Sequence, residues 1–229
     1  MTLLKRERPS NKLAMKGSSR VADITDDAEI ERVFAGLDRL DILVNNAGIV
    51  DPATFPSLDA ETFARVLDVN LLGAYRCTKA AHSLLTQSGH GRVVNITSME
   101  AHYLLATGGH VQPHYNASKA GLDLLTRALA YEMAGDGVAV NAIAPGVIDT
   151  ALTSHSLADS SIADWIVDCV PAGRVGRPED IAAVAAFLSS DDAEYVTGIS
   201  VPVDGGFTLG WFRKAPKAEA VVAASGILT

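Results

Sequence analysis

The chain alternates short apolar runs with longer segments in which apolar residues recur every three or four positions. Four runs have the length and apolar content of buried strands, at residues 42–44, 93–96, 138–144 and 199–204. A fifth run, at residues 19–24, predicts one more short strand. Each run is bounded by glycine, proline or polar residues, as expected at strand ends.

Helices are predicted between these strands. One begins at Thr25 or Asp26, either of which can cap it, and longer ones span residues 59–87 and 115–135. Pro178 starts the last helix, because proline is favourable in a first turn. Strands separated by helices predict an α/β fold, with one doubly wound parallel sheet and helices on both faces.

Composition narrows the class of protein. The chain has 229 residues, 48% of them hydrophobic and 20% charged, which suits one globular domain. A net charge of −8 argues against nucleic acid or an anionic membrane as partner. No apolar run approaches the ~18 residues that span a bilayer, and the first residues lack a signal-peptide pattern. Cys77 and Cys169 have no metal-ligand spacing. We therefore predict a cytoplasmic protein that acts on a small molecule and holds no metal.

Residues 91–119 carry the candidate chemistry. Ser98 follows the strand at 93–96, and an open parallel sheet places its reacting groups at that end of a strand. Tyr115 and Lys119 are four positions apart on a predicted helix, so they share one face. A neighbouring ammonium favours the phenolate and would lower the pKa of Tyr115 from about 10. Alone, this pair is more commonly a half-buried tyrosine with a snorkelling lysine beside it, because the spacing occurs by chance on many helices.

Five motifs occur together and in order. They are NNAG at 45–48, LDVN at 67–70, NITS at 95–98, YNASK at 115–119 and PGVIDT at 145–150. In this arrangement residues 20–207 resemble the short-chain dehydrogenase/reductase (SDR) family. The resemblance implies a Rossmann-like sheet with strand order 3-2-1-4-5-6-7. It also implies hydride transfer between a nicotinamide cofactor and a secondary alcohol or ketone, in a homo-oligomer (dimer or tetramer).

The resemblance also implies roles for individual residues. Tyr115 would be the acid/base, and Lys119 would lower its pKa and bind the ribose hydroxyls. Ser98 would orient the substrate together with Tyr115, and Asn70 would interrupt its helix and hold a relay water. The other predicted cofactor-binding residues are Asp23, Ile24, Asn45, Ala47, Gly48, Pro145, Gly146, Ile148 and Thr150. The cofactor would be NADP or NAD, and Lys5 and Arg6 favour NADP slightly.

The first residues depart from the family pattern. The family opens with a strand, a glycine-rich turn and a helix that together bind the pyrophosphate, but Gly17 is the only glycine before Gly36 here. The domain at 20–207 is therefore expected to be N-terminally truncated relative to the family. Residues 1–19 are either a remnant of the next strand–helix unit or an unrelated tail, and residues 208–229 form a C-terminal tail. The alternative function is a catalytically impaired, cofactor-free scaffold.

Two segments should surround the substrate. The stretch between Ser98 and Tyr115 carries His102, His110 and His114, which are either part of a pocket wall or ordinary surface histidines. Residues 151–172 have poor periodicity and fall where the family places its variable substrate lid. Neither segment identifies the substrate.

Overall fold

Four parallel strands form the sheet of this computed structural model, which describes residues 19–106 and 111–210. They lie in the order β1-β2-β3-β4. Their bounds are β1 Ile42–Asn45, β2 Arg92–Ile96, β3 Ala139–Pro145 and β4 Ser200–Val203. All neighbouring pairs are parallel, with Val44 opposite Val94 and Ile143 opposite Val201. The predicted doubly wound α/β fold is confirmed, and these four strands match the predicted runs to within one or two residues.

Seven α-helices are described, three of them long. They are α1 (Asp27–Ala35), α2 (Ala60–Leu67), α3 (Gly73–Ser88), α4 (Pro113–Met133), α5 (Ser154–Ala158), α6 (Ser160–Cys169) and α7 (Pro178–Leu188). A π-helical segment, η1 (Asp68–Leu72), joins α2 to α3. Short 3₁₀ turns follow at η2 (Met99–Ala101), η3 (Ala134–Asp136), η4 (Asp191–Ala193) and η5 (Phe207–Leu209).

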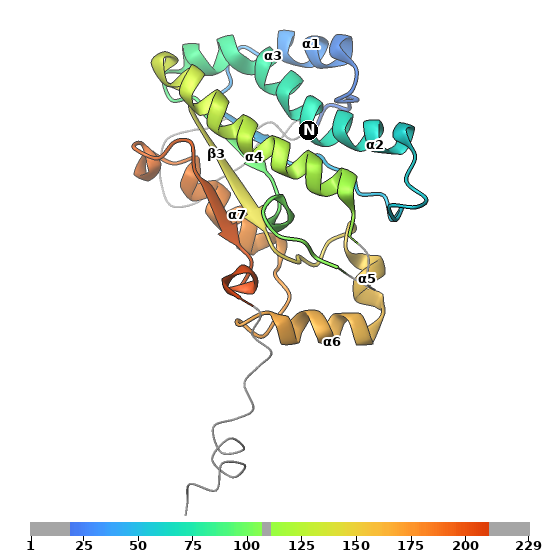
Figure 1. The fold of residues 1–229 in the computed structure, drawn as a ribbon. Coiled ribbons are helices and arrows are strands. Elements are labelled where there is room, and N and C mark those ends of the chain that lie inside the picture. The colour runs from blue at the N-terminus through green and yellow to red at the C-terminus, as the bar shows by residue number, and fades with distance from the viewer. Residues whose placement is uncertain (1–18, 107–110, 211–229) are drawn as a thin grey trace, which may run out of the picture.

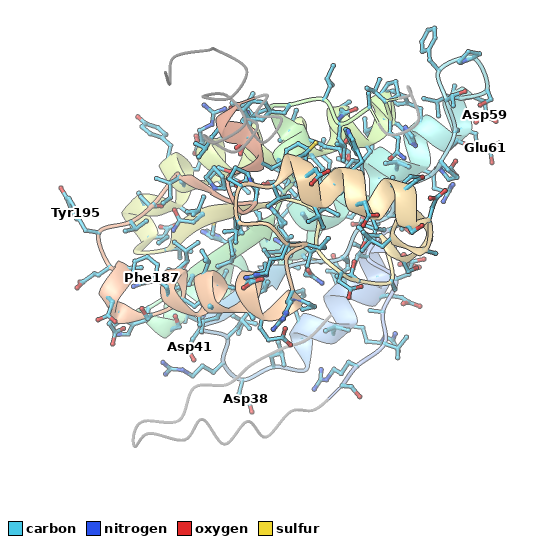
Figure 2. The ribbon with its side chains drawn as sticks, turned by 90° about the horizontal axis from the view of Figure 1, so that it is seen from below. Asp38, Asp41, Asp59, Glu61, Phe187 and Tyr195 are labelled. Carbon is cyan, nitrogen blue, oxygen red and sulfur yellow. The ribbon has the colours of Figure 1, made fainter. Side chains whose placement is uncertain are left out.

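Side-chain caps fix several helix starts. Of the two residues proposed to cap α1, Asp26 does so, because its carboxylate accepts from the backbone N–H of Ala28 and Glu29. Asp59 caps α2 in the same way, and Figure 2 shows it at the start of that helix, beside Glu61. Pro178 occupies the first turn of α7, as predicted.

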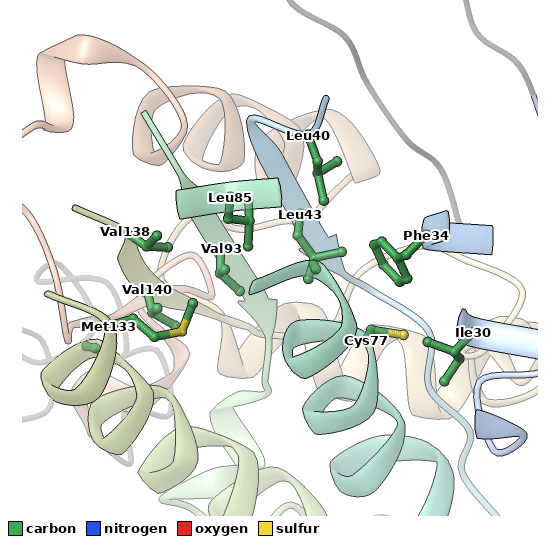
Figure 3. Packing of buried hydrophobic residues seen from close by; sticks show 12 residues of the cluster. Ile30, Phe34, Leu40, Leu43, Cys77, Leu85, Val93, Met133, Val138 and Val140 are labelled. Carbon is green, nitrogen blue, oxygen red and sulfur yellow. The ribbon is translucent and has the colours of Figure 1, made fainter. Parts of the chain in front are cut away.

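Alternating side chains on the strands build a core on each face of the sheet. On one face, Leu43, Val93 and Val140 pack with α1, α3 and α4, and Figure 3 shows Cys77 and Leu85 of α3 over these strands. On the other face, a second cluster joins the strands to α7 (Val94, Ile143 and Leu188, with Ile181 and Val184). Figure 1 shows α3 and α4 on one side of the sheet and α7 on the other. The inner strands β2 and β3 are therefore buried on both faces, which explains their continuous apolar runs, whereas Pro202 of β4 is exposed.

The predicted strand at residues 19–24 is wrong. Only Ser19 makes a single β-bridge, and the chain then forms a turn. The Asp23 carboxylate accepts from both the N–H and the hydroxyl of Thr25, a local hydrogen-bond pattern that competes with sheet pairing. Val21 is 94% exposed, so no burial favours a strand, while Arg20 donates to the carbonyl of Gly36 after α1. Among the described residues β1 pairs with β2 and with no other strand.

The helix predicted over 59–87 is divided into three segments. The π-helical segment η1 separates α2 from α3 at the position of Asn70, as the resemblance implied. The two terminal segments predicted at 1–19 and 208–229 fall mostly outside the described residues. In the described part, no helix has both the length and the apolar content to cross a bilayer.

Candidate active site

The carboxyl ends of the strands place the candidate residues on one edge of the sheet. The motif residue Asn45 ends β1, Ser98 lies two residues beyond β2, and Pro145 ends β3. Helix α4 packs against β3 and against η2, the turn that follows Ser98. Tyr115 and Lys119 lie in the first two turns of α4 and therefore reach the same edge. The structure brings the predicted Ser98, Tyr115 and Lys119 together.

Ser98 is held in an extended backbone conformation by its neighbours. Its φ and ψ are −165° and 155°, and its hydroxyl caps η2 by accepting from the N–H of Glu100 at 3.1 Å. The preceding Thr97 anchors the turn to β3, because its hydroxyl donates to the carbonyl of Ile143 at 2.8 Å. Ser98 is only 7% exposed, and its side chain interacts with Tyr115 closely enough to lower the pKa of the phenol.

Tyr115 and Lys119 form a buried pair. They are 9% and 4% exposed, and the Lys119 Nζ lies 5.7 Å from the centroid of the Tyr115 ring. The ammonium donates to the carbonyl of Ile96 at 2.9 Å, at the end of β2. An ammonium has three donors, and its others have no partner in the described part of the chain. Lys119 therefore keeps donors for a ligand at this edge.

The electrostatics of the pair differ from the sequence-based expectation. Burial raises the pKa of Tyr115 to about 12; the hydrogen bond with Ser98 acts against this rise and the charge of Glu100 adds to it. Burial also lowers the pKa of Lys119 to about 8. Burial is the largest cause of the raised Tyr115 pKa and Lys119 is not among the causes, so the predicted lowering by Lys119 is not found here. Near neutral pH, Tyr115 is a protonated phenol and a hydrogen-bond donor.

Asn70 connects three parts of the site. Its Oδ1 accepts from the N–H of Ile49 at 2.8 Å, and its Nδ2 donates to the carbonyl of Ile49 at 2.9 Å. The same Nδ2 donates to the hydroxyl of Ser118 at 3.0 Å, next to Lys119. The side chain is 1% exposed, so these bonds are shielded from water. Asn70 thereby ties the loop after β1 to helix α4, and its predicted role in holding a water stays a prediction.

The NNAG turn combines a structural residue with an exposed loop. The side-chain amide of Asn45 donates both of its hydrogen bonds inside the protein, from Nδ2 to Thr78 Oγ1 at 3.0 Å and to Asn95 Oδ1 at 2.8 Å. These bonds connect β1 to α3 and β2. Ala47 and Gly48, by contrast, are exposed. A side chain at Gly48 would meet Asn70 Oδ1 at 3.3 Å and Lys119 Nζ at 3.4 Å, so the bare backbone leaves room beside the ammonium. Ala47 and Gly48 fit a cofactor ribose, whereas the side chain of Asn45 has no donor left for one.

The remaining predicted cofactor residues lie in two places. After β3, Ile148 is 8% exposed and makes a parallel bridge to Gly176, which leaves Thr150 exposed at the surface. Gly146 is required by packing, because a side chain there would meet the Cα of Asp204 at 2.7 Å. Asp23 and Ile24 lie before α1 and differ from each other. The Asp23 carboxylate is engaged by Thr25, and hydrogen bonds from Thr25 lower its pKa. Ile24 packs on the core.

Sequence reasoning assigned no role to three residues around this pair. The hydroxyl of Ser118 accepts a hydrogen bond from Asn70. The charge of Glu100 raises the pKa of Tyr115. Asn116 donates to the Glu100 carboxylate at 3.2 Å. The sequence signal for these three polar residues was their position, because each lies one or two places from Ser98, Tyr115 or Lys119. His114 is fully buried, and neither ring nitrogen has a hydrogen-bond partner among the described residues. The surface interpretation is therefore wrong for His114, whereas His102 is exposed and contacts Asp123, with 3.4 Å between Nε2 and Oδ1. His110 lies outside the described residues.

One cavity of about 100 Å³ lies at the other edge of the sheet. Arg39, Asp41 and Arg92 line it at the amino ends of β1 and β2. None of the predicted site residues lines this cavity. Within residues 19–106 and 111–210, no group of three or more histidine, cysteine, aspartate or glutamate side chains could hold a metal ion.

Comparisons with known proteins agree with this geometry. The family model described as enoyl-(acyl carrier protein) reductase matches residues 5–208. Acetoacetyl-CoA reductase of Rhizobium meliloti is 40% identical over 177 residues, which are 77% of this chain and 71% of that protein. The 3beta-hydroxysteroid dehydrogenase 1 of Eggerthella lenta is 40% identical over 187 residues, covering 80% of this chain and 69% of that protein.

Solved structures show the same similarity. The gluconate 5-dehydrogenase of Burkholderia cenocepacia, crystallised with NADP and tartrate, superimposes with a TM-score of 0.78 at 29% identity. That superposition covers 82% of this chain and 74% of the other. A short-chain type dehydrogenase/reductase from Mycobacterium marinum superimposes with a TM-score of 0.75 at 32% identity, over 82% and 74% of the two chains. The chain belongs to the short-chain dehydrogenase/reductase family of oxidoreductases.

Proposed function

We propose that this chain interconverts a secondary alcohol and a ketone, with NADP or NAD as hydride carrier. The observation that carries the proposal is the buried Tyr115, which lies beside the Lys119 ammonium and interacts with Ser98. The relatives act on different compounds by name, a coenzyme A thioester, a steroid and a sugar acid. Carbonyl or alcohol chemistry is what these three have in common.

The three candidate residues would have different roles in substrate binding, proton transfer and cofactor binding. Ser98 would hold the substrate oxygen against the Tyr115 hydroxyl, which can give its proton to a ketone oxygen because burial keeps the phenol protonated near neutral pH. Lys119 would donate to the ribose hydroxyls with the donors that Ile96 leaves available. The bound nicotinamide would supply or accept the hydride. The protonated Tyr115 phenol therefore suits the proton-donor role in ketone reduction.

Binding of the cofactor would use the exposed carboxyl edge of the sheet. Ala47 and Gly48 offer backbone next to Lys119, and Ile148 and Thr150 follow β3 on the same edge. The NADP complex of the gluconate 5-dehydrogenase supports this choice of ligand. Lys5 and Arg6, which would favour NADP, lie outside the described residues.

We further propose that the chain is a cytoplasmic homo-oligomer. Its two cysteines, Cys77 and Cys169, are both free, as expected for a protein of a reducing compartment. Exposed apolar side chains along η1, α3 and α4 support self-association.

The decisive experiment compares Tyr115→Phe with Tyr131→Phe. Tyr131 lies on the same helix but is 86% exposed, so its variant is the matched control. NADPH and then NADH are titrated into each protein by fluorescence, after which ketone reduction is measured. We expect saturable binding by all proteins and a rate at least about a hundredfold lower in Tyr115→Phe alone. Equal rates in both variants would remove Tyr115 from the mechanism. No cofactor binding by a folded sample would instead favour the cofactor-free scaffold.

A further inference from the structure

Glu100 lies between the two groups that would handle the substrate oxygen. It belongs to the turn η2, and its backbone N–H donates to the Ser98 hydroxyl at 3.1 Å. Its side chain reaches helix α4, where Asn116 Nδ2 donates to Oε2 at 3.2 Å and to the Glu100 carbonyl at 3.1 Å. Asn116 directly follows Tyr115 in the sequence. One residue therefore touches Ser98 through its backbone and the start of α4 through its carboxyl group.

The carboxyl group is largely buried but has no cation in contact. In the described part of the chain no lysine, arginine or histidine forms an ion pair with Glu100, and its Oε1 has no hydrogen-bond donor. Two elements pack against η2, namely α4 and β3. Strand β3 carries no titratable side chain, so the ionisable groups near Glu100 come from the start of α4 and the end of the turn: His102, His114, Tyr115, Lys119 and Asp123. His102 is paired with Asp123, and among the described residues neither His102 nor Lys119 forms an ion pair with Glu100.

We propose that Glu100 is a positioning residue of the active site, which acts through Tyr115: its charge sets the pH at which the Tyr115 hydroxyl exchanges its proton. The inference rests on the proposed oxidoreductase function for its kinetic consequence. Its structural basis, an unpaired carboxyl group between Ser98 and α4, does not depend on that function.

The direction of the effect follows from the charges. Burial raises the pKa of Glu100 to about 7, against a smaller opposing effect of the Asn116 hydrogen bond. Above that pH the carboxylate is charged and raises the pKa of Tyr115, which opposes the phenolate. Below it the carboxyl is neutral and this opposition disappears. Alcohol oxidation needs the Tyr115 phenolate as proton acceptor. An ionised Glu100 should therefore shift the rise of the oxidation rate with pH to higher pH.

The kinetic test uses Glu100→Gln, which removes the charge and keeps an oxygen that can accept from Asn116. Glu132→Gln is the matched control, because Glu132 is exposed near the other end of α4, about 25 Å along the helix. We expect the midpoint of the oxidation rate against pH to fall by about one pH unit in Glu100→Gln, with kcat altered and KM nearly unchanged. In the control the midpoint should not move. An unchanged midpoint in Glu100→Gln would overturn the proposal.

A second measurement separates this proposal from the enzymatic one. In the cofactor-free protein, the side-chain carbon of Glu100 is assigned by its absence in Glu100→Gln and followed by carbon-13 NMR against pH. We expect it to titrate at about 7, with a smaller perturbation of Tyr115 at the same pH. Titration in the ordinary range of exposed glutamates would overturn the proposal even in an active enzyme. If no reaction can be found, the NMR result still decides whether Glu100 carries the predicted charge.

Discussion

Tyr115 and Lys119 illustrate how burial controls individual residues in this protein. Removal from water disfavours the charged form of both groups, so the phenol stays protonated and the ammonium loses its proton more readily. Their four-residue spacing is visible in the sequence. The sequence does not show that burial controls their pKa values, because burial depends on how η2, β2 and the first turns of α4 enclose the two side chains.

Lys119→Met should stabilise the protein while it removes the proposed activity. The folded-state pKa of Lys119 is lowered to about 8, so below that pH the folded protein holds an ammonium that it disfavours relative to the unfolded chain. Loss of the hydrogen bond to Ile96 offsets part of the gain, and we expect a net increase of about 1 kcal/mol in unfolding free energy at pH 7.

The gain should shrink as the pH rises from 8 toward 10.5, where the lysine becomes neutral in both states. Urea denaturation at several pH values measures it. Lys79→Met, at an exposed position on α3, is the matched control and should change stability little. A Lys119→Met protein less stable than the wild type at pH 7 would show that the Ile96 hydrogen bond outweighs the cost of burial.

At the scale of the element, the π-helical segment η1 decides where the loop after β1 lies. The extra residue in this turn of helix places Asn70 inside the protein, where it bonds both backbone groups of Ile49. Segments of this kind often occur at functional sites. Here the segment fixes the exposed Ala47 and Gly48 beside Lys119 through a single amide side chain.

Asn70→Ala should therefore weaken both the fold and the proposed cofactor site. It removes three hydrogen bonds and leaves buried groups of Ile49 unpaired, at a cost of about 2–3 kcal/mol in unfolding free energy. Affinity for NADPH should fall as well, because the loop is no longer held. Thermal unfolding and fluorescence titration measure the two effects. Asn46→Ala, at an exposed asparagine of the same loop, should leave stability unchanged; equal losses in both variants would argue against a special role for Asn70.

At the scale of the whole molecule, several large apolar side chains are exposed on the surface. Leu124 and Tyr131 are seven residues apart on α4, so they share a face, and they are 61% and 86% exposed. Leu72 and Tyr75 add exposed apolar surface on η1 and α3, and Figure 1 shows α3 and α4 running along the same side of the sheet. Phe187 and Tyr195 are exposed as well, on the opposite side from Asp59 and Glu61 in Figure 2. Two such surfaces suit a dimer or a tetramer.

Leu124→Arg should dissociate the proposed oligomer, because it places a charge in the middle of the α3–α4 face. Sedimentation velocity should show a smaller species than the wild type at the same concentration. Phe55→Arg makes a similar change at a 79% exposed side chain in the loop before α2, and should leave the mass unchanged. Identical sedimentation of all three proteins would exclude this face as the interface.

Local pattern was sufficient for the strands of the sheet and for the selection of the candidate site residues. The four strands and the long helices follow from alternation and periodicity, which involve only neighbouring residues. Ser98, Tyr115 and Lys119 stand out because their motifs occur in order. The strand predicted at 19–24 failed for the complementary reason: an exposed Val21 and a local turn at Asp23 outweighed an apolar pattern.

Tertiary structure alone decided the contacts that make the site work. Asn70 meets Ser118 across 48 positions of sequence, and Lys119 meets Ile96 across 23. Asn116 meets Glu100 across 16 positions, and this contact brings a carboxyl group to Tyr115. The sequence by itself determined which chemical groups are present and on which elements they lie. Their burial, and with it their pKa, was decided only when the sheet brought distant segments together, because desolvation depends on every atom around a group and not on its neighbours in the chain.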